Sequence, residues 1–410
     1  MSKLEELIQE LCPDGVEYKT ISSLSKSIVS GGTPKTSEKS YYGGNIPWLR
    51  TQEVNFCDIK ETGIYITEEG LKNSSAKWIP KNCVIIAMYG ATVGKVAINK
   101  IPLTTNQACC NIELNDDMVL YKYVFYCLSN LYEYIKSLGQ GSQTNINAQI
   151  VKKLSIPVPP LPIQAEIVRI LDNFTELTAE LTAELTARKQ QYEYYRDSLL
   201  NYDDKTITRE LGDVCDISAG GDAPKNKMSK QKTEEYQIPI ISNGIGENSI
   251  YGYTDEFKIK IPAVTVAARG TIGYAEYRNY PYYPIIRLLS VIPKDNNVLD
   301  TKYLYYCLQG KKYQVPEGGI PQLTAPMLKK IKIGLPKLNI QKRIVEVLDN
   351  FESICSDLNI GLPAEIEARQ KQYEYYRDSL LTFAETGRIM PSKQASKQAS
   401  KQASKQASKH

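Results

Sequence analysis

The sequence predicts an α+β protein built from two copies of one plan, each copy a mixed, strand-rich domain followed by a long helix. Three observations support this prediction. The two halves of the 410-residue chain repeat one another, short β-branched runs punctuated by Gly, Pro and Asn fill the first part of each half, and apolar residues at 3–4 spacing fill the second. The length agrees, because 410 residues exceed what one ordinary core accommodates.

The internal repeat is clearest near the end of each half. The segment QYEYYRDSLL at 191–200 recurs letter for letter at 372–381, and IVRILDNF at 167–174 corresponds to IVEVLDNF at 344–351. Weaker matches reach the beginning of each half and include the glycine turns MYGATVGK and ARGTIGY. The middles of the two halves have diverged, so we expect one scaffold that presents two different binding surfaces.

The first part of each half is predicted to be a mixed domain with more strand than helix, over 1–155 with an N-terminal helix and over 204–333. Runs such as VIIAMYG, KVAINK and AVTVAARG have the β-branched composition and the flanking turn residues that are typical of strands. Two segments inside these domains, 120–138 and 301–310, have helical spacing instead.

The second part of each half is predicted to be a long helix, over 156–203 and over 334–385, that begins after a proline-containing segment. The apolar residues of each helix form a heptad seam. The seam residues are Ile163, Ile167, Ile170, Phe174, Leu177, Leu181, Leu185, Tyr192, Tyr195 and Leu199 in the first helix, and Ile340, Ile344, Val347, Phe351, Ile354, Leu358, Ile366, Tyr373, Tyr376 and Leu380 in the second. We therefore expect the helices to pack on each other, with a kink or short break at Gly361–Pro363.

A tandem of TAEL units at 178–185 places a four-residue stutter in the first seam. The span from Phe174 to Gln191 is four residues shorter than the equivalent span from Phe351 to Gln372. Four helical residues add about 6 Å and turn the helix about 40° beyond a full circle, so a unit lengthens the helix while the seam stays roughly in register. The alternative is a helix that is merely repetitive.

The composition excludes several classes of catalytic and metal site. The one histidine, His410, is the last residue, which excludes a Ser-His-Asp or Cys-His arrangement and a zinc site with histidine ligands. Nine cysteines without a C-x-x-C pair predict buried thiols rather than disulfides or a metal site. The segment GATVGK at 90–95 lacks the spacing and the Ser or Thr of a phosphate loop.

The formal charge of +4 gives no argument for a nucleic-acid partner, because the five lysines of the terminal SKQA repeats account for it. Residues 386–410 form a polar, low-complexity tail that we expect to be unstructured. The N-terminal segment has no apolar core of signal-peptide type, and no apolar run approaches the length of a membrane span. The expected location is therefore the cytoplasm, without a membrane partner.

Local patches nevertheless have the chemistry of DNA contact. SGGTPKTSEKSYYGGN at 30–45 and APKNKMSKQKTEEYQ at 223–237 place lysines in equivalent positions of the two halves, and loops rich in amides and hydroxyls follow. Arg and Lys bind phosphates and guanine edges, and Gln and Asn bind adenine. Taken singly, each loop could be a solvated turn, but two equivalent patches in a repeated frame favour DNA. The candidate contact residues are Lys35, Lys39, Arg50, Gln52, Lys95, Gln140, Ser142, Gln143, Lys225, Lys227, Lys230, Asn243 and Arg269.

Together these motifs resemble the specificity subunits of type I restriction–modification enzymes. The resemblance extends to about residue 385. It rests on the SGGTPK segment, the two glycine turns, KKLSIPVPPLPIQAEIVRILDNF at 152–174 with its second copy, both QYEYYRDSLL blocks and the TAEL tandem.

The resemblance implies a non-catalytic DNA reader with two target recognition domains, separated by two long antiparallel coiled-coil helices in a pseudo-two-fold internal repeat. Each domain would read one half of a bipartite, asymmetric site in double-stranded DNA, and the helices would set the length of the unread spacer. The helices would also dock methylation subunits, expected to number two, and restriction/translocation subunits would join them. The chain itself would hold no cofactor and no metal, since S-adenosylmethionine, ATP and Mg would be used by the partner subunits.

Two other classes of protein share single features with this sequence. A coiled-coil scaffold or adaptor without DNA contact would use the paired helices equally well, but it does not need two strand-rich domains with glycine turns and basic loops. A nucleotide-dependent enzyme would need a site that the sequence does not contain.

Overall fold

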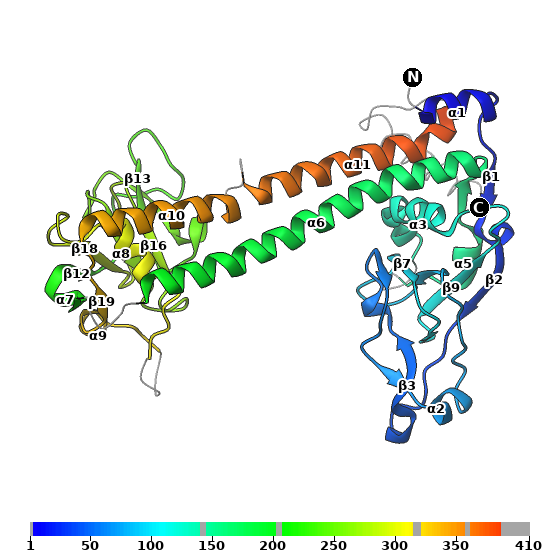
Figure 1. Cartoon of the computed structure of the whole chain (residues 1–410), viewed down its shortest axis with the longest axis horizontal. Helices are drawn as coiled ribbons and strands as arrows, with labels where there is room; N and C mark the ends of the chain where they lie inside the picture. Colours follow the sequence, from blue (N-terminus) through cyan, green and yellow to red (C-terminus); the bar gives the residue numbers. More distant parts are fainter. Residues whose placement is uncertain (1–2, 140–144, 202–206, 315–320, 357–360, 387–410) are drawn as a thin grey trace. The chain divides into compact units, whose positions relative to one another are not determined.

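The structure is a computed structural model that describes residues 3–139, 145–201, 207–314, 321–356 and 361–386. It divides into two compact units, one made of Met1–Leu181 with Ile366–His410 and the other of Thr182–Glu365. We call them unit 1 and unit 2 (Figure 1). The boundary between them falls inside two helices, α6 (Leu161–Leu200) and α11 (Leu362–Thr386). The SKQA repeats lie outside the described residues.

The described part of unit 1 contains a five-stranded sheet of order β2-β9-β6-β7-β4, a three-stranded sheet β5-β3-β8 and a two-stranded sheet β1-β10. Its strands are β1 (Tyr18–Thr20), β2 (Ser25–Ser30), β3 (Tyr42–Leu49), β4 (Cys57–Ile59), β5 (Tyr65–Ile66), β6 (Val84–Ala87), β7 (Val96–Asn99), β8 (Thr104–Thr105), β9 (Cys109–Leu114) and β10 (Ser155–Pro157). Its shorter helices are α1 (Lys3–Leu11), η1 (Ile21–Leu24), η2 (Lys39–Tyr41), η3 (Thr51–Glu53), α2 (Glu68–Lys72), α3 (Tyr121–Asn130), α4 (Tyr132–Ser137) and α5 (Ala148–Lys153). The three-stranded sheet lies on the side of the domain away from α6 (Figure 1).

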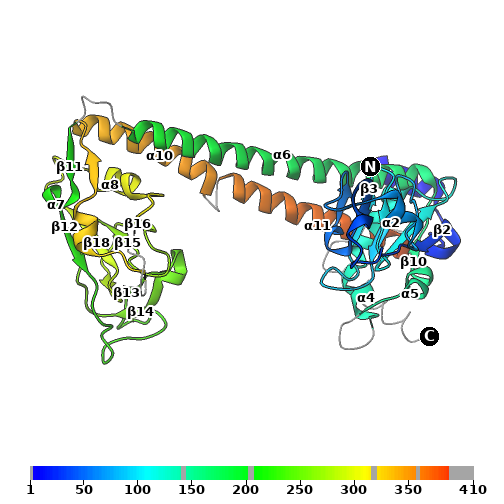
Figure 2. The ribbon, with the colours of Figure 1, turned by 90° about the horizontal axis from the view of Figure 1, so that it is seen from below.

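The described part of unit 2 repeats this plan with a four-stranded sheet β12-β18-β15-β16, a three-stranded sheet β14-β13-β17 and a two-stranded sheet β11-β19. Its strands are β11 (Thr208–Glu210), β12 (Cys215–Ala219), β13 (Ile238–Ile241), β14 (Ile250–Thr254), β15 (Ala263–Val266), β16 (Ala275–Arg278), β17 (Tyr283–Pro284), β18 (Leu289–Pro293) and β19 (Lys332–Gly334). Its helices, besides the end of α6, are α7 (Leu211–Val214), η4 (Gly246–Ser249), α8 (Thr301–Leu308), α9 (Ala325–Lys329) and α10 (Leu338–Ser356). The three-stranded sheet again lies away from the long helix, here α10 (Figure 2).

The two units match strand for strand. The larger sheets share one order and antiparallel pairing, apart from the additional β4, and the three-stranded sheets share the parallel pairs β3·β8 and β13·β17. The central strands β6 (VIIA) and β15 (AVTV) are buried along their whole length, which explains their continuous apolar or β-branched sequences. The predicted α+β fold with an internal repeat is therefore confirmed.

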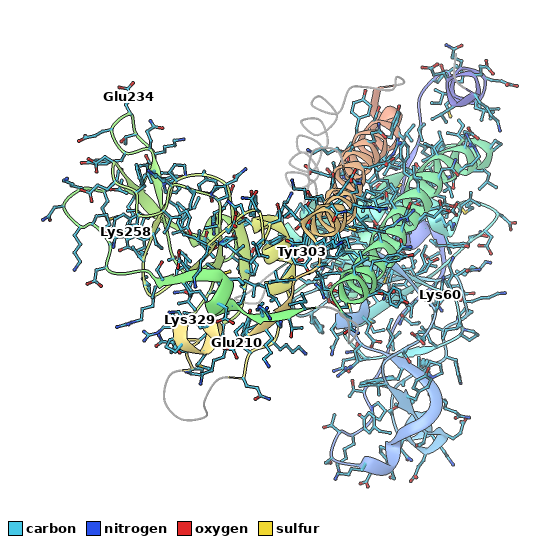
Figure 3. The ribbon with its side chains drawn as sticks, turned by 60° about the vertical axis from the view of Figure 1, so that its left-hand side comes forward. Lys60, Glu210, Glu234, Lys258, Tyr303 and Lys329 are labelled. Atoms are coloured by element: carbon cyan, nitrogen blue, oxygen red, sulfur yellow. The ribbon has the colours of Figure 1, made fainter. Side chains whose placement is uncertain are left out.

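Equivalent tyrosines join one helix of each unit, α3 or α8, to the short sheet that precedes the long helix. Tyr123 of α3 and Tyr303 of α8 are fully buried, and Tyr303 is labelled in Figure 3. Their hydroxyls donate hydrogen bonds of 3.1 Å to the carbonyls of Pro157 and Gly334, in β10 and β19. A buried tyrosine hydroxyl needs such a partner, so these contacts fix the position of the helix relative to the short sheet.

A buried glutamine attaches each long helix to its domain. In unit 1 the side-chain amide nitrogen of Gln164 donates to the carbonyls of Pro159 (2.7 Å) and Met118 (3.2 Å). Its amide oxygen accepts from the backbone N–H of Leu120 at 2.9 Å, at the start of α3. The equivalent contacts of Gln341 in unit 2 are with the carbonyls of Pro336 (2.8 Å) and Val298 (2.8 Å) and with the N–H of Asp300 (2.9 Å).

An aspartate two turns further along the helix makes a second attachment. Asp172 of α6 accepts hydrogen bonds from the ammonium of Lys122 (2.6 Å) and the hydroxyl of Tyr126 (2.7 Å), both on α3. The same contacts in unit 2 join Lys302 and Tyr306 of α8 to Asp349 of α10. We call the glutamine and aspartate contacts of each unit its helix clamp. Because the clamp uses charge-assisted and buried hydrogen bonds, each domain is fixed to its own helix.

The long helices pack on each other in both units. In unit 1 α11 runs antiparallel beside α6 (Figures 1 and 2), and the ring of Phe174 stacks on Tyr376 with centroids 5.2 Å apart. In unit 2 Phe351 of α10 stacks on Tyr195 of α6 at 5.5 Å. Each stacked pair joins equivalent residues of the repeat, so the predicted packing of the long helices on each other is confirmed within each unit.

The second helix differs in two ways from an uninterrupted coiled coil. As the prediction of a break requires, α10 ends at Ser356 and α11 begins at Leu362. The seam assignment was wrong for Ile340, Val347 and Ile354, which are 45%, 41% and 43% exposed; the predicted seam residue Leu358 lies outside the described residues. The reason is that α10 turns its buried face, with Ile344 and Leu348, into the core of unit 2.

The cysteines are buried thiols, as predicted. None of the nine forms a disulfide with another described residue, and eight of them are buried. Burial raises the pKa of Cys110 to about 12, so its thiol stays protonated at neutral pH. Among the described residues, no group of three His, Cys, Asp or Glu side chains could hold a metal ion. The helices in the described part of the chain include none that is long and apolar enough to cross a membrane.

Candidate nucleic-acid interface

In each unit, loops from distant parts of the sequence meet at one edge of the sheets and are tied together by hydrogen bonds. We call this region the loop edge. It consists of residues 31–35, 50–56, 88–95, 105–108 and 145–146 in unit 1, and of residues 220–225, 242–248, 268–274, 285–288 and 322–323 in unit 2.

The loop edge of unit 1 depends on glycines and on a threonine. The N–H of Gly32 donates to the carbonyl of Thr105 at 2.8 Å. A Cβ atom on the preceding Gly31 would lie 2.0 Å from the same carbonyl oxygen, so this close approach requires glycine. The hydroxyl of Thr92, in the glycine turn, donates to the carbonyl of Thr51 at 2.7 Å. The SGGTPK segment and the glycine turn thus shape the frame of this edge.

The loop edge of unit 2 is joined by the amide of Asn243. The amide nitrogen donates to the carbonyl of Ile286 (2.7 Å), and the amide oxygen accepts from the N–H of Ala268 (2.7 Å). The hydroxyl of Thr271, which corresponds to Thr92, donates to the backbone carbonyl of Asn243 at 2.7 Å. Asn243 was predicted as a DNA contact, and its amide is occupied by bonds that connect three loops.

The candidates Arg50, Gln52 and Lys95 lie together on the loop edge of unit 1. With the Gln52 amide turned so that its oxygen rather than its nitrogen faces the guanidinium group, this oxygen accepts from Nη2 (2.9 Å) and Nη1 (3.3 Å) of Arg50. The Nε of Arg50 is buried and has no partner among the described residues. The ammonium of Lys95 donates to Asn55 at 2.7 Å and lies 5.9 Å from the ring centre of Phe56. The loop of Arg50 and Gln52 is joined to the glycine turn of Lys95 through the bonds Lys95–Asn55 and Thr92–Thr51.

The other candidates of unit 1 lie further along the same loops. Lys35 and Lys39 are exposed, in the segment after Gly32 and at the start of η2. Gln140, Ser142 and Gln143 lie outside the described residues. Next to them Asn145 has a buried side-chain oxygen with no partner among the described residues.

The lysine candidates of unit 2 lie between β12 and β13 in the chain, in a segment that pairs with β14 through Ser229 and Tyr253. Lys227 forms an ion pair of 2.7 Å with Glu256, and the ammonium of Lys230 lies 3.6 Å above the ring of Tyr251. Lys225 is exposed. Exposed pairs of this kind contribute only about 0–1 kcal/mol, so such lysines can exchange their protein partners for phosphate at little cost.

Arg269 is held by Gln322. The amide oxygen of Gln322 accepts from Nε (3.1 Å) and Nη2 (2.7 Å) of Arg269. Sequence reasoning identified the arginine but missed its partner. A signal was present, because Gln322 stands two residues before the cap residue Thr324, as Asn145 stands two residues before the cap residue Asn147, close after the predicted candidates of the first half.

Sequence reasoning also missed Lys258 and Arg287. The ammonium of Lys258, a residue labelled in Figure 3, lies 4.4 Å from the ring centre of Tyr283. It also lies close to Gly221, since a Cβ atom built on that glycine would be 3.5 Å from the ammonium. Arg287 is exposed, and both it and Ile286 have positive φ angles, of 57° and 53°. No sequence motif indicates Lys258 or Arg287, because strand pairing rather than proximity in the sequence brings these residues to the loop edge.

Comparisons with known proteins identify this arrangement. The family model for the type I restriction modification DNA specificity domain matches the chain twice, over residues 13–188 and 203–368. The chain belongs to this family. The two matched segments include both strand-rich domains and most of the helices, which agrees with the internal repeat.

Individual relatives support the assignment over most of the chain. A putative type I restriction enzyme specificity subunit of Haemophilus influenzae is 32% identical, over 90% of this chain and 96% of its own length. The EcoR124I/EcoR124II specificity subunit of Escherichia coli is 36% identical, over 66% of this chain and 72% of its own length. The predicted resemblance to type I specificity subunits is thereby confirmed, and with it the prediction that the chain is a specificity component rather than an enzyme.

Solved structures agree in fold. A type I S subunit from M. genitalium has a TM-score of 0.53 at 16% identity, covering 90% of this chain and 96% of its own. A chain from a study of complex assembly and conformational transition of the type I R-M system has a TM-score of 0.59 at 17% identity, covering 90% and 98%. At these identities the likeness concerns the fold alone, and it extends over 90% of this chain.

Replacing Asn243 by alanine should destabilise unit 2 of this specificity subunit by about 1–3 kcal/mol, because it leaves a backbone N–H and a carbonyl of the loop edge unpaired. Urea denaturation measures the loss, and hydrogen exchange should show faster exchange at Ala268. The control is Gln52→Ala, whose exposed amide should change stability by less than about 0.5 kcal/mol. Equal effects of the two substitutions would contradict the structural role of Asn243.

Proposed function

We propose that this specificity subunit reads a bipartite, asymmetric site in double-stranded DNA, one half-site with each loop edge, and so directs adenine methylation and restriction by its partner subunits. The observation that supports this proposal is the repeated frame with different side chains. At the loop edge, unit 1 presents Arg50 and Gln52 from the loop after β3, whereas unit 2 presents Arg269 from its glycine turn. A shared frame with different donors suits two different base sequences.

Charge around each loop edge supports contact with the DNA backbone. Exposed lysines accompany both edges, with Lys35 and Lys39 in unit 1 and Lys225 and Lys258 in unit 2. Neutralising phosphates with such lysines releases counterions, which gives salt-dependent affinity without base preference. The lysines would therefore position the duplex, and the amides and guanidinium groups would select its sequence.

The helix clamps support the proposal that helix length sets the spacer. Each domain is bonded to a long helix through Gln164 and Asp172 or through Gln341 and Asp349. A change in helix length is therefore passed on to the domain and not absorbed at a hinge beside it. One TAEL unit adds about 6 Å and a net rotation of about 40°. The rotation is close to the roughly 35° between successive base pairs of a duplex with about 10 pairs per turn.

The exposed stripe on α10 supports the docking of methylation subunits. Ile340, Val347 and Ile354 recur at intervals of seven residues, so they lie on one face and together suit an apolar helix of a partner. The methylation subunits, which we propose number two, would supply the S-adenosylmethionine chemistry. Restriction subunits would use ATP and Mg, which leaves this chain without a cofactor of its own.

In unit 1 a helix of the chain itself, α1, covers the face that corresponds to the exposed stripe on α10. There α1 packs beside the beginning of α6, with Leu4 and Ile8 in one buried cluster with Ile163, which corresponds to Ile340. The ammonium of Lys3 lies 3.3 Å from the carboxylate of Glu166. An amphipathic helix with charged ends thus fits this face in one unit and is a reasonable model for the partner at the other.

The direct test of the proposal is to map methylated adenines by single-molecule sequencing in cells that express this chain with its cognate methylation subunit. A bipartite motif should appear only when the chain is present. Unchanged methylation, with a folded chain bound to its partner, would contradict the proposed function and favour the scaffold alternative.

Inserting one more TAEL unit after Leu185 should lengthen the spacer of this motif by about one base pair and leave both half-sites unchanged, because only the distance and rotation between the clamped domains change. Methylation mapping of the variant measures the spacer. Adding one SKQA unit to the tail is the matched control, with no expected change. The proposal that the helix sets the spacer fails if the TAEL insertion leaves the spacer unaltered.

Replacing Val347 by glutamate should reduce binding of the methylation subunit at least about tenfold, because a charge in an apolar contact costs more than 1.4 kcal/mol. Stability should change little, since the residue is exposed. Affinity is measured by titration of purified subunits. Val298→Glu, also in unit 2 and 49% exposed but off the helices, is the control. Normal binding by the Val347 variant would argue against docking at this stripe.

A further inference from the structure

Two arginines of the loop edges are each held by a glutamine, but in opposite orientations. A guanidinium group has a side edge, formed by Nε and one Nη, and an end edge, formed by the two Nη atoms. The oxygen of Gln322 binds the side edge of Arg269, through Nε at 3.1 Å and Nη2 at 2.7 Å. The oxygen of Gln52 binds the end edge of Arg50, at 2.9 and 3.3 Å.

This difference decides which arginine can offer a pair of donors to a ligand. Nη1 of Arg269 has no hydrogen bond to any described residue, and Nη2 keeps a second N–H, so the end edge is available. In Arg50 the end edge is occupied and the remaining Nε is buried without a partner. Arg269 is therefore oriented in advance for a bidentate contact, whereas Arg50 must first leave Gln52.

The acceptor pair that fits the end edge of an arginine is found on guanine. In the major groove guanine presents O6 and N7 side by side, and a bidentate arginine is the most frequent specific contact to them. Because Gln322 already restrains the side chain of Arg269, less conformational freedom is lost when the contact forms. Gln322 uses its own acceptor to hold the arginine, so it cannot at the same time make the bidentate contact to adenine that glutamine otherwise makes.

The corresponding positions of unit 1 hold different chemistry. Tyr89 precedes the glycine of its turn, as Arg269 does in unit 2, and it is 39% exposed and uncharged. Asn145 is the equivalent of Gln322, because each directly precedes a residue whose N–H donates to the carbonyl of the residue at the start of the turn. These bonds are Ile146 to Met88 in unit 1 and Leu323 to Ala268 in unit 2. The arginine and glutamine thus occupy this place in unit 2 alone, so any base preference that they give belongs to one half-site.

We propose that Arg269 reads a guanine in the half-site recognised by unit 2, and that Gln322 is the positioning residue that fixes its guanidinium group for this contact. The inference rests on the proposed function, and it adds the identity of one base and of the two residues that select it.

The experiment maps the methylation motif of the full chain, co-expressed with its methylation subunit, for Arg269→Lys and Arg269→Ala. The unaltered chain should require a guanine at one position of the second half-site. Both variants should lose the preference for that guanine by about 5- to 150-fold, the range that corresponds to the discrimination of a good bidentate pair, and should keep all other positions. Lysine keeps the charge and lacks the fork, so it separates a base contact from a phosphate contact.

Variants of Gln322 test the positioning role. Gln322→Ala should weaken the preference at the same guanine by less than the arginine variants do, while Gln322→Glu, which keeps an acceptor, should restore it. Arg209→Ala, an exposed arginine on β11 of the same unit, is the matched control and should leave the motif unchanged. Thermal unfolding and co-purification with the methylation subunit check that each variant is folded.

Two results would overturn the inference and leave the proposed function standing. One is an unchanged motif in the folded Arg269 variants. The other is a uniform loss of methylation with Arg269→Ala that Arg269→Lys restores, which would identify a phosphate contact. A different result, no bipartite motif with the unaltered chain, would overturn the proposed function and this inference together.

Discussion

The attachment of each domain to its long helix is the constraint on which the proposed function depends. Gln164 and Gln341 are fully buried, and each amide satisfies two carbonyls and one backbone N–H of its domain. Releasing such an amide would leave several buried polar groups unpaired, at about 1–3 kcal/mol each. The domain and the adjoining part of the helix therefore move as one body. A loose attachment would make helix length irrelevant to the DNA site.

At each loop edge the residues have two roles: one set connects the loops into a frame, and another set faces outward. Glycines with no room for a side chain, the paired threonines Thr92 and Thr271, and the amide of Asn243 connect the loops. Arg50 and Arg269 stand on this frame with one edge of each guanidinium group already bound. This arrangement lets the outward residues differ between the units while the sheets beneath them keep the same order.

Much of the fold could be predicted from the sequence, because its signals are local or repeated. Buried strands such as VIIA, the heptad seam and the break near Pro363 follow from patterns of a few residues, and the letter-for-letter repeat predicted two equivalent units. The exposure of Val347 could not be predicted from its seam position, because it depends on which face of α10 the domain covers. The bonds of the Asn243 amide could not be predicted either, because its partner Ile286 lies far along the chain.

The most direct test of the account is to weaken one clamp and measure the spacer. In a chain with Gln341→Leu and Asp349→Ala, the strand-rich part of unit 2 should lose its clamp bonds to α10 while both loop edges keep their residues. Methylation mapping of this variant, folded and bound to its methylation subunit, should find the same two half-sites separated by more than one spacer length. A single, unchanged spacer length would contradict the claim that the clamps transmit helix length to the reading domains.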